Sequence, residues 1–429
     1  MDLGWQYLTR DDKRAILRGI RDGRAYGGPY HVEIHPADRC NIECFFCSTA
    51  AIRGTDELPQ QRIEELIGEL KQAGTRAIRL AGGGEPLFHR RIKHVLRAIA
   101  ASGIPIENIT SNAVILDDET ARILTTCCDQ ITVSLNTFGA ESYASMMQTP
   151  AKNYERVLKN VRNLIAVRTT RPRVNLQFLV WKENFRDIPN MYALARELGV
   201  DTILFSGLAF LGPGQKMTDE EHAEMLRLYE DVIRVDEFRR ITNIGSFERD
   251  LTGDIAALTT RMSGERRARG VVARARSFFS RDESLRDKVR HHLRMRRNVR
   301  ADKATADFEE ACVIGWYSML VRSSGTIAPC CILQHKPLGN IFAKSLSEVW
   351  NGDAFANYRR ELTQIIRDRD AWDADGNVTL EPVCGVKGTD LCPMKSFYFA
   401  RDVEFMRGLD EAFSAIGGGA RARFRRVEE

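Results

Sequence analysis

An alternation of short apolar runs and amphipathic segments between residues 28 and 213 constrains the fold most. Six runs rich in β-branched and aliphatic residues lie at 31–36, 77–83, 107–112, 130–136, 173–180 and 201–207. The segments between them have helical periodicity; in 60–72, for example, apolar residues recur at positions 63, 66, 67 and 70. Gly74, Gly103 and Gly199 follow three of these segments, at the position where glycine favours a helix end.

Six βα units in succession predict an α/β fold, because right-handed helical crossovers place consecutive strands in parallel in one sheet. An open doubly wound sheet and a partial (β/α)6 barrel both satisfy this pattern. In both, ligands bind at the carboxyl ends of the strands. The residues that directly follow each strand are therefore the candidates for function.

Composition excludes several classes of protein. The chain has 429 residues, of which 43% are hydrophobic and 28% charged, so it is not a mostly disordered protein. No apolar run approaches the roughly 20 residues of a membrane helix, and the N-terminus lacks the apolar segment of a signal peptide. We therefore expect a cytoplasmic protein with no membrane partner. Its ten cysteines are not expected to form disulfides; the clustered ones are expected to bind metal or carry out redox chemistry, and Cys127 and Cys128 to be buried structural residues.

Three cysteines directly follow the first strand. Cys40, Cys44 and Cys47 have the spacing C-x3-C-x2-C, which lets one short loop hold three corners of a cubane [4Fe–4S] cluster. A structural zinc ion would need a fourth ligand, for which only His35 or Glu43 is near in sequence. A cluster held by three thiolates leaves one iron open to a small molecule.

With the aromatic Phe46 before its last cysteine, this loop resembles the signature of the radical S-adenosylmethionine (radical SAM) superfamily. The resemblance implies a partial (β/α)6 TIM-like barrel over about residues 28–212 and a [4Fe–4S] cluster that binds SAM. In this family, reduction of the cluster cleaves SAM to a 5′-deoxyadenosyl radical, which removes a hydrogen atom from the substrate. An external flavodoxin- or ferredoxin-like electron donor is also implied.

The turn after the second strand fits the same resemblance. Gly83, Gly84 and Glu85 resemble the family's GGE motif, which binds the amino group of SAM. Glycines permit a close backbone approach, and a carboxylate can pair with an ammonium group. Taken without the cysteines, the same residues are equally compatible with an ordinary βα turn.

Polar residues follow the next three strands. Ser134 and Asn136 stand where relatives often have Ser-x-Asp against the ribose hydroxyls, with Asn here in place of Asp. Ser111 and Asn112 resemble the polar strand-end residues of relatives. Gln177 is a further candidate for a polar contact with the cofactor.

A second set of cysteines lies near the C-terminus. The pattern C-x12-G-x4-C formed by Cys312, Gly325 and Cys330 resembles the start of a SPASM or twitch domain, with the glycine in a hairpin turn. The resemblance implies one auxiliary [4Fe–4S] cluster; the expected ligands are Cys312, Cys330, Cys384 and Cys392. Four cysteines also suit zinc, so a zinc-stabilised module remains an alternative.

Cys331 directly follows one of these expected ligands. It is either a spare or alternative ligand, or a catalytic thiol that donates a hydrogen atom to a substrate radical.

These patterns divide the chain into five regions. We predict an N-terminal helical extension (1–27), a radical SAM partial barrel (28–213), a helical Arg-rich insertion (214–311), a Cys-rich SPASM/twitch-like domain (312–400), and a C-terminal helix with a flexible tail (401–429). Within 261–303, 15 Arg or Lys residues stand against five acids. This segment is either a solvated helical face or a grip on an anionic substrate. Sparse aromatic residues argue against nucleic acid as a partner.

Three hypotheses for function follow. The first is a radical SAM enzyme that oxidises or epimerises a small sugar- or nucleoside-like natural-product precursor, with help from one auxiliary cluster. The second is a peptide maturase that forms a crosslink or thioether on a ribosomal peptide. The third is a zinc-stabilised binding protein without enzymatic activity.

Overall fold

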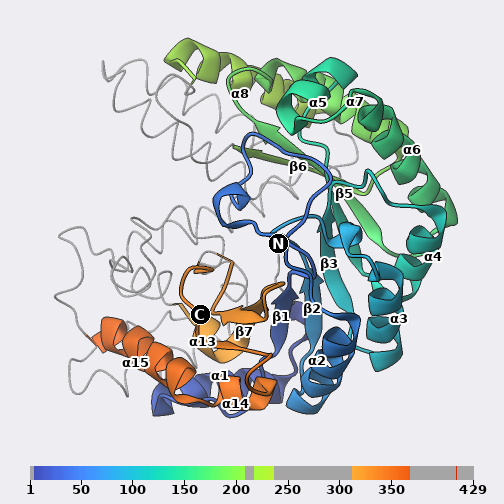
Figure 1. Ribbon diagram of the computed structural model, residues 1–429. Helices are drawn as coiled ribbons and strands as arrows, with labels where there is room; N and C mark the ends of the chain where they lie inside the picture. Colours follow the sequence, from blue (N-terminus) through green and yellow to red (C-terminus); the bar gives the residue numbers. More distant parts are fainter. Residues whose placement is uncertain (1–3, 208–216, 236–311, 332, 368–411, 413–429) are drawn as a thin grey trace, which may run out of the picture.

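One curved sheet organises the part of the chain that the structure describes, which comprises residues 4–207, 217–235, 312–331, 333–367 and residue 412. Within these ranges, the computed structural model has a nine-stranded sheet in the order β6-β5-β4-β3-β2-β1-β7-β8-β9. The six predicted strands are β1 His31–Ile34, β2 Ala77–Leu80, β3 Ile106–Ser111, β4 Gln130–Ser134, β5 Arg173–Val180 and β6 Thr202–Gly207. They run parallel, which confirms the predicted partial (β/α)6 barrel (Figure 1).

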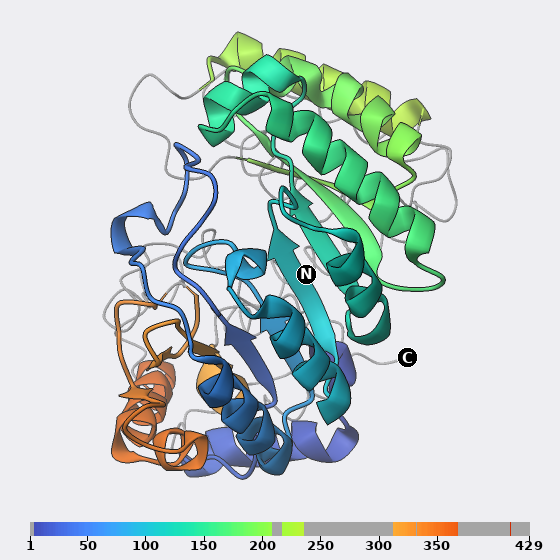
Figure 2. The same cartoon turned by 45° about the vertical axis from the view of Figure 1, so that its right-hand side comes forward.

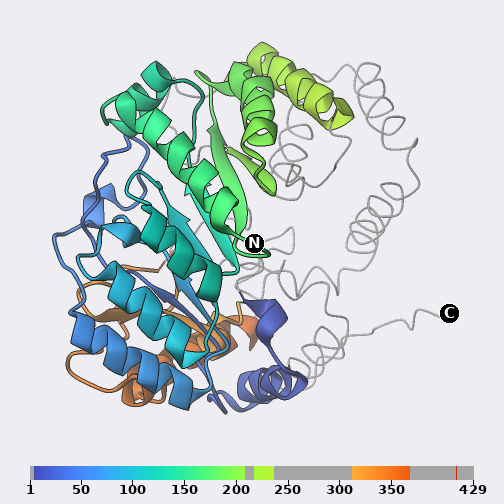
Figure 3. The same ribbon diagram turned by 90° about the vertical axis from the view of Figure 1, so that its right-hand side faces the viewer.

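Helices between the strands cover the outer face of the sheet (Figure 3). They are α2 Gln60–Ala73, α3 Ile92–Ser102, α4 Asp118–Cys127, α5 Ala140–Met147, α6 Lys152–Val167 and α7 Ile188–Leu198, and α8 Asp219–Val235 follows β6. The periodic apolar residues of α2 are buried as predicted. Gly74, Gly103 and Gly199 end their helices with φ of 79°, 78° and 71°, a left-handed conformation that glycine adopts without strain.

The N-terminal segment packs under the amino-terminal ends of the strands. The 3-10 helix η1 Trp5–Tyr7 buries Trp5, whose ring lies 5.3 Å from that of Tyr317. The Tyr7 hydroxyl forms a hydrogen bond with Asp129, just before β4. The following helix, α1 Arg10–Asp22, begins with a capping box, and Asp12 of that box also accepts a 2.8 Å hydrogen bond from Arg76, just before β2.

The C-terminal Cys-rich region continues the barrel sheet. Strand β7 Ser318–Val321 pairs in parallel with β1. The strands β8 Thr326–Ala328 and β9 Gly339–Asn340 follow antiparallel, and the predicted turn at Gly325 joins β7 to β8 with φ of 77°. The sequence predicts residues 312–400 as a small domain, and the structure adds that its first strand occupies the free edge of β1.

Helices of this C-terminal region pack against one another and, on the barrel, against α2 (Figure 2). They are α13 Ile314–Tyr317, α14 Leu346–Trp350 and α15 Asp353–Arg367. The Trp350 indole donates a 3.0 Å hydrogen bond to the carbonyl of Gly27, and the Leu346 amide donates a 2.6 Å bond to Glu69 on α2. The two parts therefore share both hydrogen bonds and the continuous sheet.

A buried arginine joins the helices of the C-terminal region. Arg359 is 2% exposed, and its guanidinium donates to the carbonyls of Gly315 and Trp350 at 2.7 and 2.9 Å. It also lies over the ring of Trp350, 4.5 Å from the centroid. Burial lowers the pKa of Arg359 to about 10, and within the described ranges no acidic side chain pairs with it.

Several predicted features lie outside the described residues. These are most of the Arg-rich insertion, Cys384, Cys392 and the C-terminal tail. In the described parts of the chain, no helix has the length and apolar character needed to span a membrane.

We expect Arg359→Ala to lower the free energy of unfolding by about 3 kcal/mol, because it removes two hydrogen bonds to helix-end carbonyls and leaves a cavity. Chemical denaturation followed by circular dichroism measures this. The neighbouring exposed Arg360 is the matched control, and Arg360→Ala should change stability by less than about 0.5 kcal/mol. Equal effects of the two substitutions would contradict the role given to Arg359.

Candidate active site

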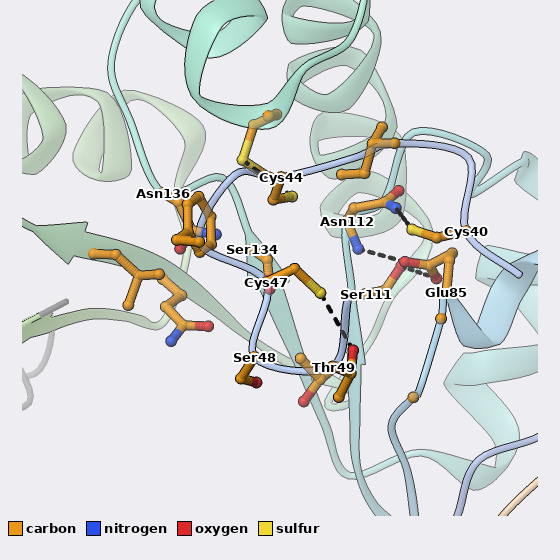
Figure 4. Close-up of a pocket in the computed structure, with 18 of the residues that line it drawn as sticks. Cys40, Cys44, Cys47, Ser48, Thr49, Glu85, Ser111, Asn112, Ser134 and Asn136 are labelled. Atoms are coloured by element: carbon orange, nitrogen blue, oxygen red, sulfur yellow. Dashed lines mark hydrogen bonds between the residues drawn. The ribbon is translucent and has the colours of Figure 1, made fainter. Parts of the chain in front are cut away.

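A cavity of about 400 Å³ opens at the carboxyl ends of the strands (Figure 4). Its lining includes every residue of the barrel that the sequence predicts for the site: Cys40, Cys44, Phe46, Cys47, Gly83, Gly84, Glu85, Ser111, Asn112, Ser134, Asn136 and Gln177. The lining residues not predicted as site residues are Ile42, Ser48, Thr49, Arg53, Gly82, Thr110, Met147, Leu179 and Gly207. The structure thus brings together residues that span more than 160 positions of sequence.

The cysteine loop, residues 38–54, is closed at its base by backbone pairing. The Asp38 amide donates to the Asp56 carbonyl at 2.9 Å, and Ala37 forms a bridge with Glu57. Arg39 adds a 2.6 Å ion pair with Glu57. These contacts hold together the two ends of a loop that would otherwise be long and irregular.

Helix α5, which the sequence analysis did not predict, supports the middle of this loop. The amides of Glu43 and Phe45 donate to the carbonyls of Met147 and Met146 at 3.2 and 3.3 Å, at the C-terminus of α5. The Cys44 thiol lies 3.7 Å from the sulfur of Met147. Tyr143, Met146 and Met147 are buried at helical spacing, and this short periodic pattern could have revealed the helix.

The Cys40 and Cys44 thiols occupy an environment that disfavours their free thiolates. Burial raises the pKa of Cys44 to about 12, with further contributions from the other two cysteines, and it also raises the pKa of Cys40. Arg53 acts in the opposite direction on both. Bound cationic iron would stabilise thiolates here, because a coordinating metal deprotonates its thiol ligands.

The glycine turn, residues 82–85, lies directly against the cysteine loop. The Gly84 amide donates to the Ala37 carbonyl at 3.1 Å, and the Glu85 amide donates to the Arg39 carbonyl at 3.0 Å. A Cβ on Gly84 would lie 2.1 Å from the carbonyl oxygen of Arg39. Only glycine permits this approach.

Thr49 adds a side-chain link between the same two segments. Its hydroxyl donates to the carbonyl of Gly83 at 2.8 Å and lies 3.2 Å from the sulfur of Cys47. In the sequence, this role is indicated only by the position of a threonine two residues after Cys47.

Glu85 is held by hydrogen bonds within the protein. Its carboxylate accepts from the Ser111 hydroxyl at 2.7 Å, the Asn112 amide at 2.7 Å and the Leu87 amide at 3.0 Å. Burial raises its pKa, although these hydrogen bonds favour the ionised form. In this structure Glu85 joins β2 to the end of β3, and its pairing with the amino group of SAM stays a prediction.

The ends of β4 and β5 present polar groups on another side of the cavity. Asn136 has φ of 62°, a left-handed conformation that Asn tolerates, and its amide donates to the Gln177 carbonyl at 2.8 Å. The side-chain oxygen Oδ1 of Asn136 is buried with no hydrogen-bond partner in the described structure. An unpaired buried acceptor in a cavity suits a ligand hydroxyl.

Below the cavity, the inner face of the sheet is polar. Five neighbouring strands each contribute one residue, namely Glu33, Arg79, Asn108, Thr132 and Asn175. The Asn108 amide group donates to the Thr132 hydroxyl at 3.0 Å. Although burial opposes ionisation, the hydrogen bond from His35 and the charge of Arg79 lower the pKa of Glu33 to about 2. Barrel interiors are usually packed with Val, Ile and Leu, so this face is unusual.

These observations fit a [4Fe–4S] cluster and SAM. The three thiols and the glycine turn line one cavity, and Asn136 offers a free acceptor (Figure 4). Within the described ranges, no three His, Cys, Asp or Glu side chains are grouped so that they could hold a single metal ion. Three thiols on one short loop match the three corners of a [4Fe–4S] cluster that such a loop can hold.

Cys312, Cys330 and Cys331 of the C-terminal region do not line this cavity. Cys312 precedes α13, and Cys330 and Cys331 follow β8, so they flank the β7–β8 hairpin. Cys330 is buried, and the carbonyl of Cys331 accepts a 2.8 Å hydrogen bond from Gln334. The auxiliary ligand set and the hydrogen-donor role of Cys331 stay predictions.

Comparison with protein families agrees with this geometry. The family model of the radical SAM superfamily matches residues 34–195, and that of the SPASM iron–sulfur cluster-binding domain matches residues 312–381.

Curated relatives match the barrel region. The chain is 26% identical over 197 residues to a probable GTP 3′,8-cyclase of Saccharolobus islandicus, covering 46% of this chain and 62% of the relative. It is 30% identical over 192 residues to the GTP 3′,8-cyclase of Chlorobaculum tepidum, covering 44% and 56%. The chain therefore spans about three fifths of the length of these relatives.

Solved structures share the fold over more of the chain. Streptococcus suis SuiB bound to precursor peptide SuiA has a TM-score of 0.54 and 18% identity, covering 80% of this chain and 69% of SuiB. The structure of anSMEcpe with bound AdoMet has a TM-score of 0.50 and 13% identity, covering 91% and 99%. Identities this low show a shared fold alone.

Gly84→Ala should displace the cysteine loop, because its Cβ would overlap the carbonyl oxygen of Arg39. We expect the variant to lose most of the iron bound through Cys40, Cys44 and Cys47, measured by iron analysis after anaerobic reconstitution. Gly68→Ala on α2 is the control, since no atom lies within 4 Å of its added Cβ. Full iron content in Gly84→Ala would show that the close approach is not required.

Proposed function

We propose that this chain, in which residues 34–195 match the radical SAM family model and residues 312–381 match that of the SPASM iron–sulfur domain, removes a hydrogen atom from a small sugar- or nucleoside-like molecule. The substrate is then oxidised or epimerised with help from one auxiliary cluster. The observation that carries the proposal is the single cavity lined by three thiols, a glycine turn and an unpaired acceptor, above a polar inner face.

The chain's own residues bind and orient the reactants. Cys40, Cys44 and Cys47 would hold three irons of a [4Fe–4S] cluster and leave the fourth open to SAM. When bound, the reduced cluster would supply the electron for reductive cleavage of SAM. Asn136 accepts a hydrogen bond from a ribose hydroxyl through Oδ1, and Ser134 lies on the same wall. Phe46 and Leu179 add apolar surface to the lining of the cavity.

The polar lining of the cavity supports a small hydroxylated substrate. Thr110 and Gln177, which line it, offer both donors and acceptors, and these match hydroxyl groups better than they match an apolar side chain. The matched relatives are named as cyclases of GTP, a nucleotide. Both observations favour a sugar- or nucleoside-like molecule over a purely apolar one.

A peptide substrate is the second candidate. It is favoured by one observation, the likeness in fold to SuiB, whose structure was solved with a precursor peptide. In that case the same hydrogen abstraction would lead to a crosslink or thioether. Both candidate functions use the same auxiliary cluster and an external flavodoxin- or ferredoxin-like electron donor. The proposed ligands of that cluster are Cys312, Cys330, Cys384 and Cys392.

Cys44→Ala should abolish reductive cleavage of SAM. The two remaining thiolates, Cys40 and Cys47, do not suffice to hold a [4Fe–4S] cluster that keeps one iron open for SAM. Anaerobic assay of 5′-deoxyadenosine by mass spectrometry measures this. Cys127→Ala, in a buried thiol at the end of α4, is the control and should retain cleavage. Retained cleavage in Cys44→Ala would refute the assignment of the loop, and a colourless, iron-free wild-type protein would favour a zinc-binding module.

The substrate class is tested with the reconstituted wild-type protein, SAM and reductant. Separate incubations contain GTP, UDP-glucose, guanosine, or a short peptide encoded beside the gene. We expect one of the three small molecules to raise 5′-deoxyadenosine formation and to lose two hydrogens or change configuration. A loss of two hydrogens from the peptide instead would overturn the first candidate in favour of the second.

A further inference from the structure

An acid and a base from opposite ends of the chain meet at the base of the cysteine loop. Asp38 lies two residues before Cys40, and Arg322 directly follows β7 in the C-terminal region. Arg322 Nη2 lies 3.5 Å from Asp38 Oδ2, and the two side chains are only 14% and 3% exposed. Burying two charges costs desolvation free energy. Because water screens buried charges weakly, the charges of Asp38 and Arg322 act strongly on the groups around them.

The same guanidinium reaches the far end of the cysteine loop. Arg322 Nη2 donates a 3.0 Å hydrogen bond to the carbonyl of Ile52, five residues after Cys47. On the other side of the pair, Asp38 Oδ2 accepts from the Gly54 amide at 3.3 Å. One ion pair therefore contacts the chain both before and after the three cysteines.

Asp38 also lies against the glycine turn. A Cβ on Gly83 would be 2.3 Å from Asp38 Oδ1, so the carboxylate occupies the space behind that residue. Asp38 Oδ1 and Arg322 Nε are buried with no hydrogen-bond partner in the described structure. Because solvent does not screen these atoms fully, their charges act on the nearby cluster site.

The position of Arg322 depends on the C-terminal hairpin. Its amide donates to the Thr326 carbonyl at 2.8 Å, and its carbonyl accepts from the Gly325 amide at 2.9 Å. Cys312 and Cys330 flank this hairpin in sequence. If binding of iron by the flanking cysteines fixes the conformation of the hairpin, it also fixes the position of the Arg322 backbone.

We propose that Asp38 and Arg322 form a positioning pair, through which the C-terminal iron–sulfur region holds the cysteine loop and sets the electrostatic environment of the SAM-binding cluster. This inference rests on the proposed assignment of that cluster to Cys40, Cys44 and Cys47. Neither residue lines the cavity, so both act through the loop and the turn they contact.

The test uses the full chain, reconstituted anaerobically, with Asp38→Asn, Arg322→Gln and the double variant. The reduction potential of the cluster whose EPR signal changes on SAM addition is measured in each. Removing the negative charge in Asp38→Asn should raise the potential, removing the positive charge in Arg322→Gln should lower it, and the double variant should lie between them. A merely structural role would shift both single variants in the same direction.

Affinity for SAM supplies a second readout, by equilibrium dialysis of the reconstituted protein. We expect Arg322→Gln to weaken SAM binding about tenfold, the equivalent of one lost charged hydrogen bond. Arg186→Gln, in an exposed ion pair with Glu224, is the control and should bind SAM normally. Unchanged potential and unchanged affinity in both single variants would overturn the proposal.

Arg322→Lys keeps the inference testable if the glutamine variant folds poorly. Lysine retains the charge, so the potential should stay near that of the wild type. A shift as large as in Arg322→Gln would show that charge is not the cause. Failure of the underlying assignment gives a different result, because the wild-type protein itself would then show no cluster signal that responds to SAM.

Discussion

The close backbone approach of the glycine turn to the cysteine loop is the contact on which the site depends. Strand β1 ends at Ile34 and strand β2 at Leu80, and the segments that follow them meet through the Gly84 and Glu85 amides. Glu85 then passes the constraint to β3, because its buried carboxylate accepts from Ser111 and from the Asn112 amide. Three loops from three strands are thereby fixed relative to one another.

Asn112 connects the end of β3 to the cysteine loop. Its side-chain nitrogen donates to Asn41 at 2.8 Å and lies 3.8 Å from the sulfur of Cys40. The Glu85 carboxylate, which the family resemblance links to SAM, therefore also stabilises the wall of the cavity in this chain. It already accepts three hydrogen bonds from the protein before any ligand binds.

The sequence predicted the barrel well because its signals are local. Apolar periodicity in α2 and glycine at the ends of α2, α3 and α7 mark the elements, and parallel crossovers then determine which strand ends gather. The predicted residues from Cys40 to Gln177 line one cavity for that reason. Helix α5 was missed because eight residues carry a weak periodic signal, although its last turn supports Cys44.

Features that depend on contacts distant in sequence could not be predicted. Nothing near Ser318 indicates that β7 pairs with His31–Ile34, since a short apolar strand fits many edges. The Asp38–Arg322 pair is equally hidden, because the two residues are separated by more than 280 positions. Arg53 and Thr49 lie close to the motif, yet their role follows only from the way the loop folds back.

The parallel pairing of β7 with β1 limits how the chain can be divided. A shortened chain that ends before Ser318 would leave the backbone of β1 as an open edge, beside the loop that carries the cysteines. Open edges of this kind recruit strands from other molecules and promote aggregation. The barrel and the C-terminal region are therefore one unit of folding and solubility, although family models recognise them as two.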